Sequence, residues 1–130
     1  RITIVAGNLP YDGLFDGFDV FIMAEKYNGL SLPLAEARAS GMLVVTSDRF
    51  PMNTWLPREP LIPVHSYSVQ CISGAYKEFQ EAKVNPEAIA EKIDEWYGRD
   101  ISDYSLSGKA WAGENSWERL KPRWMEALSC

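Results

Sequence analysis

The sequence predicts an α/β domain built on a parallel sheet that is flanked by helices. Three continuous apolar runs of strand length support this prediction, at residues 2–8, 19–24 and 42–48. Runs without polar alternation are typical of strands that are covered on both faces, as in parallel sheets. A helical segment lies between the second and third runs, and the second half of the chain is mostly helical in pattern. Strand, helix and strand in this order form a βαβ unit.

The stretch "AEKYNGLSLPLAEARASG", residues 24–41, decides between two structures. Asn28-Gly29 is typical of a tight β-hairpin, because both residues tolerate a positive φ. Pro33 argues against a hairpin, since it has no N–H to donate to a returning strand. The residues after Pro33 are strong helix formers and end at Gly41, a favourable residue just after a helix. We therefore expect a loop that leads into a helix, with Ser31 as its N-cap.

The other elements follow from turn and helix signals. The segment 61–64 is a fourth candidate strand bounded by prolines, and residues 49–60, with three prolines, form an irregular loop. Helices are expected at 85–98, 102–115 and 116–128, the first with Asn85 as its N-cap and Gly98 at its end. The second is expected to be weak because of Gly108 and its serines. Pro122 is expected to kink or restart the third.

Composition limits the classes of function. The 130 residues suffice for one compact domain, so residues 1–130 are read as a single α/β unit. A net charge of −5 without a basic cluster argues against binding to nucleic acid or to an anionic membrane. Cys71 and Cys130 form neither a zinc motif nor a disulfide framework, which favours a reducing, cytoplasmic setting. No apolar run of membrane-spanning length occurs, so no transmembrane segment is expected. Because Arg1 leads almost directly into a strand-like run, we expect a piece of a longer protein.

The predicted loop 25–31 lies where α/β proteins bind ligands, beyond the carboxyl end of a strand and before a helix. Backbone N–H groups from Gly29 to Leu32 and the helix dipole can hold a phosphate or diphosphate. Glu36, about one turn into the helix, can accept two hydrogen bonds from a ribose diol. Asn28 can both donate to and accept from sugar hydroxyls. The loop therefore predicts a site for a phosphorylated, hydroxyl-rich ligand.

The segment 18–48, "FDVFIMAEKYNGLSLPLAEARASGMLVVTSD", resembles the nucleotide-sugar-binding segment of retaining GT-B glycosyltransferases of family 4, also called group 1. Later segments, "EAIAEKIDEWYG" and "NSWERL", resemble the family's next helix and its terminal signature. The resemblance implies a Rossmann-like C-terminal domain that is incomplete at its N-terminal side. It also implies a nucleoside-diphosphate-sugar donor, an unknown sugar, lipid or protein acceptor, and a missing N-terminal domain that binds the acceptor. Neither a metal nor another cofactor is implied.

Site residues are carried over position by position. Glu36 matches the second Glu of the family's motif of two glutamates separated by seven residues, and relatives use it to hold the ribose. Gly29, Leu30 and Ser31 match the loop that faces the diphosphate and the sugar. Asn28 stands where the family has its first glutamate, near the catalytic centre, so it keeps hydrogen bonding but lacks the charge. Glu25 lies three residues too early to replace that glutamate directly.

Two functions follow from the resemblance. The first is a retaining, hexosyltransferase-like enzyme, of which this piece alone is expected to be inactive. The second is a GT-B-like module that binds nucleotide sugars or assembles with other proteins without turnover, which Asn28 favours.

Structural roles also remain open for the singled-out residues. Asn28 and Gly29 can serve only to form a turn, and Glu36 can be an ordinary surface residue. Asp48 can cap the next turn as well as touch a ligand. His65 is more typical of a loop or core residue than of a catalytic one, whereas Trp55 can stack on a base or sugar.

Overall fold

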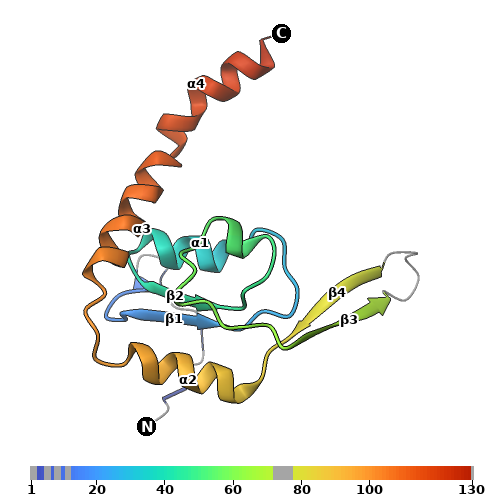
Figure 1. The fold of residues 1–130 in the computed structure, drawn as a ribbon. Helices are drawn as coiled ribbons and strands as arrows, with labels where there is room; N and C mark the ends of the chain where they lie inside the picture. The colour runs from blue at the N-terminus through green and yellow to red at the C-terminus, as the bar shows by residue number, and fades with distance from the viewer. Residues whose placement is uncertain (1–2, 5–6, 8–9, 11–12, 72–77, 130) are drawn as a thin grey trace.

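The structure is a computed structural model that describes residues 3–4, 7, 10, 13–71 and 78–129. The elements in chain order are β1 (Val20–Met23), α1 (Leu32–Ala39), β2 (Leu43–Thr46), the 3₁₀ helix η2 (Met52–Thr54), β3 (Ser66–Cys71), β4 (Glu78–Lys83), α2 (Pro86–Trp96), α3 (Ser102–Glu114) and α4 (Trp117–Leu128) (Figure 1). The strand predicted over residues 2–8 lies outside the described residues except at positions 3, 4 and 7. Cys130 also lies outside them.

The unit β1–α1–β2 is the predicted parallel βαβ unit. Strands β1 and β2 run parallel in a register that pairs Val20 with Leu43 and Met23 with Thr46. Gly41 follows the helix with a φ of +87°, the left-handed conformation that favours glycine. The hairpin alternative at Asn28-Gly29 is thereby excluded, because a hairpin would make the two strands antiparallel.

Strand β2 is buried on both of its faces, which explains its continuous apolar sequence. Val44 packs into one hydrophobic cluster, with Leu34 of α1. Leu43 and Val45 pack into a second cluster, with Trp96 of α2. Figure 1 shows α1 and α2 on opposite sides of the β1–β2 sheet. The fold is therefore mixed α/β, with a small parallel sheet and helices on both sides, as the sequence predicts at this coarser level.

The segment 61–64 does not form the predicted fourth strand. It makes one isolated parallel bridge, between Ser47 and Ile62. The Ile62 N–H donates to the carbonyl of Thr46 at 2.8 Å, and the Asp48 N–H donates to the carbonyl of Ile62 at 2.8 Å. Residue 60 would have to donate the preceding bond of the ladder, and because it is a proline without an N–H the ladder does not grow in that direction.

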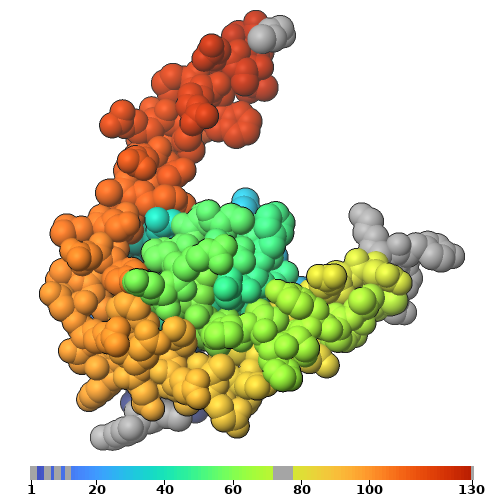
Figure 2. Space-filling view, viewed as in Figure 1, coloured from blue at the N-terminus to red at the C-terminus, as the bar shows by residue number. Residues whose placement is uncertain are grey.

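Strands β3 and β4 form an antiparallel hairpin that the sequence analysis missed. The register pairs Tyr67 with Ala82 and Cys71 with Glu78. Figures 1 and 2 show the hairpin projecting from the body of the molecule. The missed signal is the alternation of Tyr67, Val69 and Cys71 with serine and glutamine, which is the period of a half-exposed strand.

Helix α3 packs against α1 and leads into α4, which points away from the body (Figures 1 and 2). The predicted helices are all present. The ends of the helix predicted at 85–98 differ by one and two residues, and each of the other two helices differs by one residue at one end. Helix α4 continues through Pro122 and does not restart there. One face of α4 carries the apolar side chains of Trp117, Trp124 and Leu128, and all three are exposed. No helix among the described residues has the length and apolar character needed to cross a membrane.

Candidate functional site

The loop between β1 and α1 is the predicted ligand-binding loop, and it lies at the carboxyl end of β1. Strand β1 ends at Met23 and α1 begins at Leu32. Ser31 occupies the N-cap position, but its φ of 51° and ψ of 83° are left-handed and its side chain makes no capping hydrogen bond. The expectation that Ser31 caps the helix is therefore wrong for its hydroxyl group, which is used elsewhere.

Glu25 is the hydrogen-bonding centre of this loop. Its side chain is 6% exposed, and Oε1 accepts hydrogen bonds from Asn28 Nδ2 at 2.7 Å and from Ser31 Oγ at 2.6 Å. Its backbone carbonyl accepts a third bond, from Ser47 Oγ at 2.9 Å. These bonds tie both ends of the loop to the end of β2. The hydroxyl of Ser31 is committed to Glu25, and so is the amide of Asn28.

The second oxygen of Glu25 is also buried. Oε2 has no hydrogen-bond partner within the described part of the chain. A buried carboxylate oxygen without a donor is costly, because it has lost water and gained nothing in return. In the sequence, Glu25 stands out only because it lies three residues before the position of the missing glutamate. Its burial could not be inferred, because a glutamate in a loop is usually solvated.

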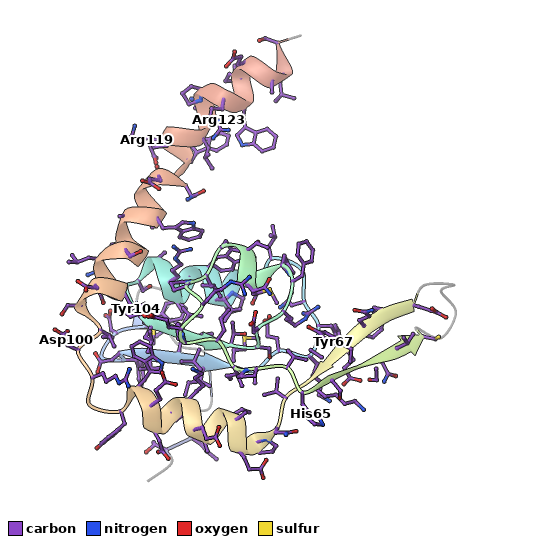
Figure 3. The ribbon with its side chains drawn as sticks, in the orientation of Figure 1. His65, Tyr67, Asp100, Tyr104, Arg119 and Arg123 are labelled. Carbon is purple, nitrogen blue, oxygen red and sulfur yellow. The ribbon has the colours of Figure 1, made fainter. Side chains whose placement is uncertain are left out.

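A cleft of about 830 Å³ opens beside the loop. Three segments line it: the loop with Tyr27, Asn28 and Gly29, the residues after β2 with Arg49 and Phe50, and the β3–β4 hairpin with Tyr67, Glu78, Phe79 and Gln80. Figure 3 labels Tyr67 near the base of the hairpin, next to His65. The hairpin that the sequence analysis missed thus provides one wall of the cleft.

The hairpin is fixed to the loop by three contacts. The Ala82 N–H donates to the Lys26 carbonyl at 2.7 Å, Lys26 Nζ lies 3.1 Å from Glu81 Oε1, and the ring centroids of Tyr27 and Phe79 lie 4.7 Å apart. The hydrogen bond from Lys26 holds the pKa of the Glu81 carboxyl below its ordinary value, although partial burial of Glu81 opposes the shift. The two walls of the cleft are therefore joined along β4, from Phe79 to Ala82.

Arg49 lies on the loop side of the cleft. Its Nη1 donates to the Asn28 carbonyl at 3.5 Å, a long bond at the outer limit of the criterion. Its Nε is buried and has no hydrogen-bond partner among the described residues. The ion pairs between described residues do not include Arg49. The sequence analysis did not single out Arg49, because only the fold brings it next to Asn28.

The structure brings some predicted site residues together and separates others. Asn28 and Gly29 line the cleft. Leu30 is exposed beside it, while Ser31 is buried under the loop. Glu36 lies in the second turn of α1 and is partly buried, and it is not among the residues that line the cleft. The predicted set therefore divides into a pair at the cleft, Asn28 and Gly29, and a helix residue, Glu36.

Three other residues with open roles have structural partners. Asp48 accepts a hydrogen bond from Asn53 Nδ2 at 2.8 Å, which is the turn-forming alternative. Trp55 stacks on Trp111 of α3 with ring centroids 5.5 Å apart, so its ring is used in packing. His65 is exposed just before β3, and its N–H donates to the carbonyl of Lys83 at 2.8 Å.

Within the described ranges, no group of three or more His, Cys, Asp or Glu side chains could hold a metal ion.

Comparisons with protein-family models, with curated proteins and with solved structures found no match to this chain. The resemblance to glycosyltransferase family 4 therefore remains a hypothesis from the sequence.

Proposed function

We propose that this chain is the nucleotide-sugar-binding part of a retaining glycosyltransferase with a Rossmann-like GT-B domain, similar to family 4. The supporting observation is the parallel β1–α1–β2 unit, which presents the loop of Asn28 and Gly29 at the carboxyl end of β1 beside a cleft of about 830 Å³. Ligands of α/β proteins bind at this end of the strands. A cytoplasmic setting and an acceptor-binding partner domain are part of the same proposal.

The proposed chemistry uses the loop and the helix together. Gly29 has no Cβ, so a diphosphate can approach the backbone, and the amino end of α1 favours its negative charge. Glu36 holds the ribose, and Asn28 hydrogen-bonds the sugar. Catalysis is electrostatic, through stabilisation of the charge that develops on the leaving diphosphate.

The test of this function is donor binding by calorimetry, with wild type, Glu36→Ala and Glu91→Ala. Glu91 is an exposed glutamate on α2, far along the chain from the loop, and serves as the matched control. We expect Glu36→Ala to weaken binding of a nucleoside-diphosphate sugar about tenfold or more, since two hydrogen bonds to a charged group are lost. Glu91→Ala is expected to bind as wild type does. Equal affinity of all three proteins for every donor tested would remove the role of Glu36.

A second function, binding or assembly without turnover, is favoured by the environment of Asn28. Its amide donates to Glu25, so the carboxylate nearest to the loop tip is buried and already used. The change Asn28→Glu alone would place two carboxylates against each other and loosen the loop. The double change Asn28→Glu with Glu25→Gln restores the family's charge and keeps one hydrogen-bonded pair.

Because this piece alone is expected to be inactive, the double variant is made in a protein that also carries the proposed acceptor-binding domain, where donor hydrolysis or sugar transfer separates the two functions. A clear rise above wild type would indicate a module that has lost turnover. A loss of wild-type activity would instead identify Asn28 as the working residue of an enzyme. Glu25→Gln alone is the control for any change that comes from the loop.

A further inference from the structure

Arg49 is a cationic residue of the cleft lining, and the proposed function leaves it without a role. It has no anionic partner in the described part of the chain, and its buried Nε has no acceptor. A guanidinium group has five N–H donors in a planar fork that matches the oxygens of a phosphate. Nη1 makes only the long bond to the Asn28 carbonyl, and a buried Nε without an acceptor is unfavourable, so a ligand that supplies acceptors to the fork is favoured.

The rest of the cleft is much larger than a phosphate group needs. Tyr67 and Gln80 lie on one face of the hairpin, because their cross-strand pairs, Tyr67 with Ala82 and Val69 with Gln80, are two residues apart. Both residues line the cleft, as does the exposed ring of Phe50 next to Arg49. Aromatic rings together with amides are suited to a ring that carries hydroxyl or amide groups.

The two walls of the cleft differ in charge. Arg49 and Gly29 belong to the loop wall of the cleft, whereas Glu78, a carboxylate of the lining, begins β4 in the hairpin wall. A phosphate is attracted to the first side and repelled by the second. Glu78 can instead accept hydrogen bonds from hydroxyl groups.

We propose that this cleft binds the diphosphate of a nucleoside-diphosphate sugar through Arg49, with Tyr67 packing against a ring next to the phosphates. The identity of the ligand rests on the proposed function, but the role of Arg49 requires only a phosphate-bearing ligand. Arg49 acts here as a binding residue, and it supplies from the segment after β2 a cation beside the loop of Asn28 and Gly29.

The first experiment measures the affinity of the chain for inorganic pyrophosphate by calorimetry. The variants are Arg49→Met, Arg49→Lys and the control Arg58→Met, an exposed arginine from the same irregular segment. We expect Arg49→Met to weaken binding about ten- to hundredfold, and Arg58→Met to leave it unchanged. Arg49→Lys is expected to lie between, since an ammonium group keeps the charge but loses the fork. Equal affinity of Arg49→Met and Arg58→Met would overturn the role of Arg49.

The second experiment tests the hairpin wall with Tyr67→Ala. Tyr67 is 51% exposed, so its removal leaves the folded core intact. We expect affinity for a nucleoside-diphosphate sugar to fall about tenfold, while affinity for pyrophosphate stays the same. An equal loss of affinity for both ligands, or no loss of affinity for either, would show that Tyr67 does not contact a ring of the ligand.

The two proposals fail in different ways. If Glu36→Ala weakens donor binding and Arg49→Met does not, the proposed function stands and the cleft is not its phosphate site. If Arg49→Met weakens pyrophosphate binding and Glu36→Ala changes nothing, the cleft stands and the ribose assignment falls. Circular dichroism of each variant confirms that a lost affinity does not come from a lost fold.

Discussion

Glu25 is the residue on which the loop depends. One of its oxygens holds both Asn28 and Ser31, and the loop carries the residues proposed to face the ligand. The other oxygen is buried without a donor among the described residues. The same side chain therefore stabilises the loop through the bonds to one oxygen and destabilises it through the other oxygen, which is buried without a donor.

Variants at Glu25 separate these two effects. Glu25→Ala removes the acceptor for Asn28 and Ser31, and we expect the free energy of unfolding to fall by about 1–3 kcal/mol. Glu25→Gln keeps an acceptor for Asn28 and Ser31, so it should lower the free energy of unfolding clearly less than Glu25→Ala does. Urea denaturation measures the free energy of unfolding of both variants, with the exposed Glu91→Ala as control. A larger loss of stability for Glu25→Gln than for Glu25→Ala would contradict this account of the loop.

Tyr104 gives the molecule a dependence on alkaline pH. It packs edge-on against Trp96 at 5.0 Å between ring centroids and donates a hydrogen bond to Glu59. Burial, followed by the contact with Glu59, raises the pKa of Tyr104 from 10.0 to about 12. The folded chain therefore keeps the phenol proton at a pH where the unfolded chain has lost it. This contribution to stability is present below pH 10.0 and is lost as the pH rises to about 12.

The variant Tyr104→Phe tests this pH dependence. We expect wild type to lose stability between about pH 10 and about pH 12 more steeply than Tyr104→Phe does. The urea midpoint measured across this range shows the difference, and Tyr97→Phe, at an exposed tyrosine, is the control. Parallel curves for wild type and Tyr104→Phe would count against the shift.

At the scale of elements, the contact between α1 and α3 depends on Gly108. A Cβ at this position would lie 2.3 Å from the carbonyl oxygen of Arg38. The sequence analysis interpreted Gly108 only as a residue that weakens a helix. Glycine is in fact required for the two helices to approach this closely, which sequence periodicity does not reveal.

The substitution Gly108→Ala is expected to destabilise the fold by about 1–3 kcal/mol, because backbone has to move to admit the methyl group. Gly113 lies in the same helix, and a Cβ there meets no atom within 4 Å. Gly113→Ala should therefore stabilise the chain by up to about 1 kcal/mol through helix propensity. Thermal and urea unfolding of the two variants give the comparison. Equal effects of the two substitutions would mean that α1 and α3 are not in close contact.

Sequence reasoning succeeded where a local pattern and the packing agree. The apolar runs at β1 and β2, the residues after Pro33 and the turn at Gly41 predicted the βαβ unit correctly. It failed where contacts across the chain decide the outcome. The hydroxyl of Ser31 bonds Glu25 and not the helix backbone, and Arg49 reaches Asn28 only in the folded chain. The hairpin carried a weak signal, since neither of its faces is strongly apolar.

On the scale of the whole molecule, stability is unevenly distributed. The described core lies on the two faces of β2, whereas α4 has no buried residue and contains Pro122 in its interior. A helix of this length in water is only marginally stable without tertiary packing.

Hydrogen exchange should therefore be fastest in α4 among the helices α1 to α4. We expect its amides to exchange far more rapidly than those of α2, which buries Trp96 against the sheet. Mass spectrometry of exchanged peptides from the two helices measures this difference. Equal protection of α4 and α2 would show that α4 is covered in solution.

The central claim is that the loop of Asn28 and Gly29 and the adjoining cleft form a nucleotide-sugar site. The most direct measurement is an NMR titration of the labelled chain with nucleoside-diphosphate sugars, which reports the position of binding without any substitution. The account predicts saturable chemical-shift changes for the backbone amides of Gly29 to Leu32, Arg49 and Tyr67. Chemical-shift changes confined to another region, such as the groove lined by Val20 of β1 and Trp96 of α2, or no changes with any donor, would contradict it.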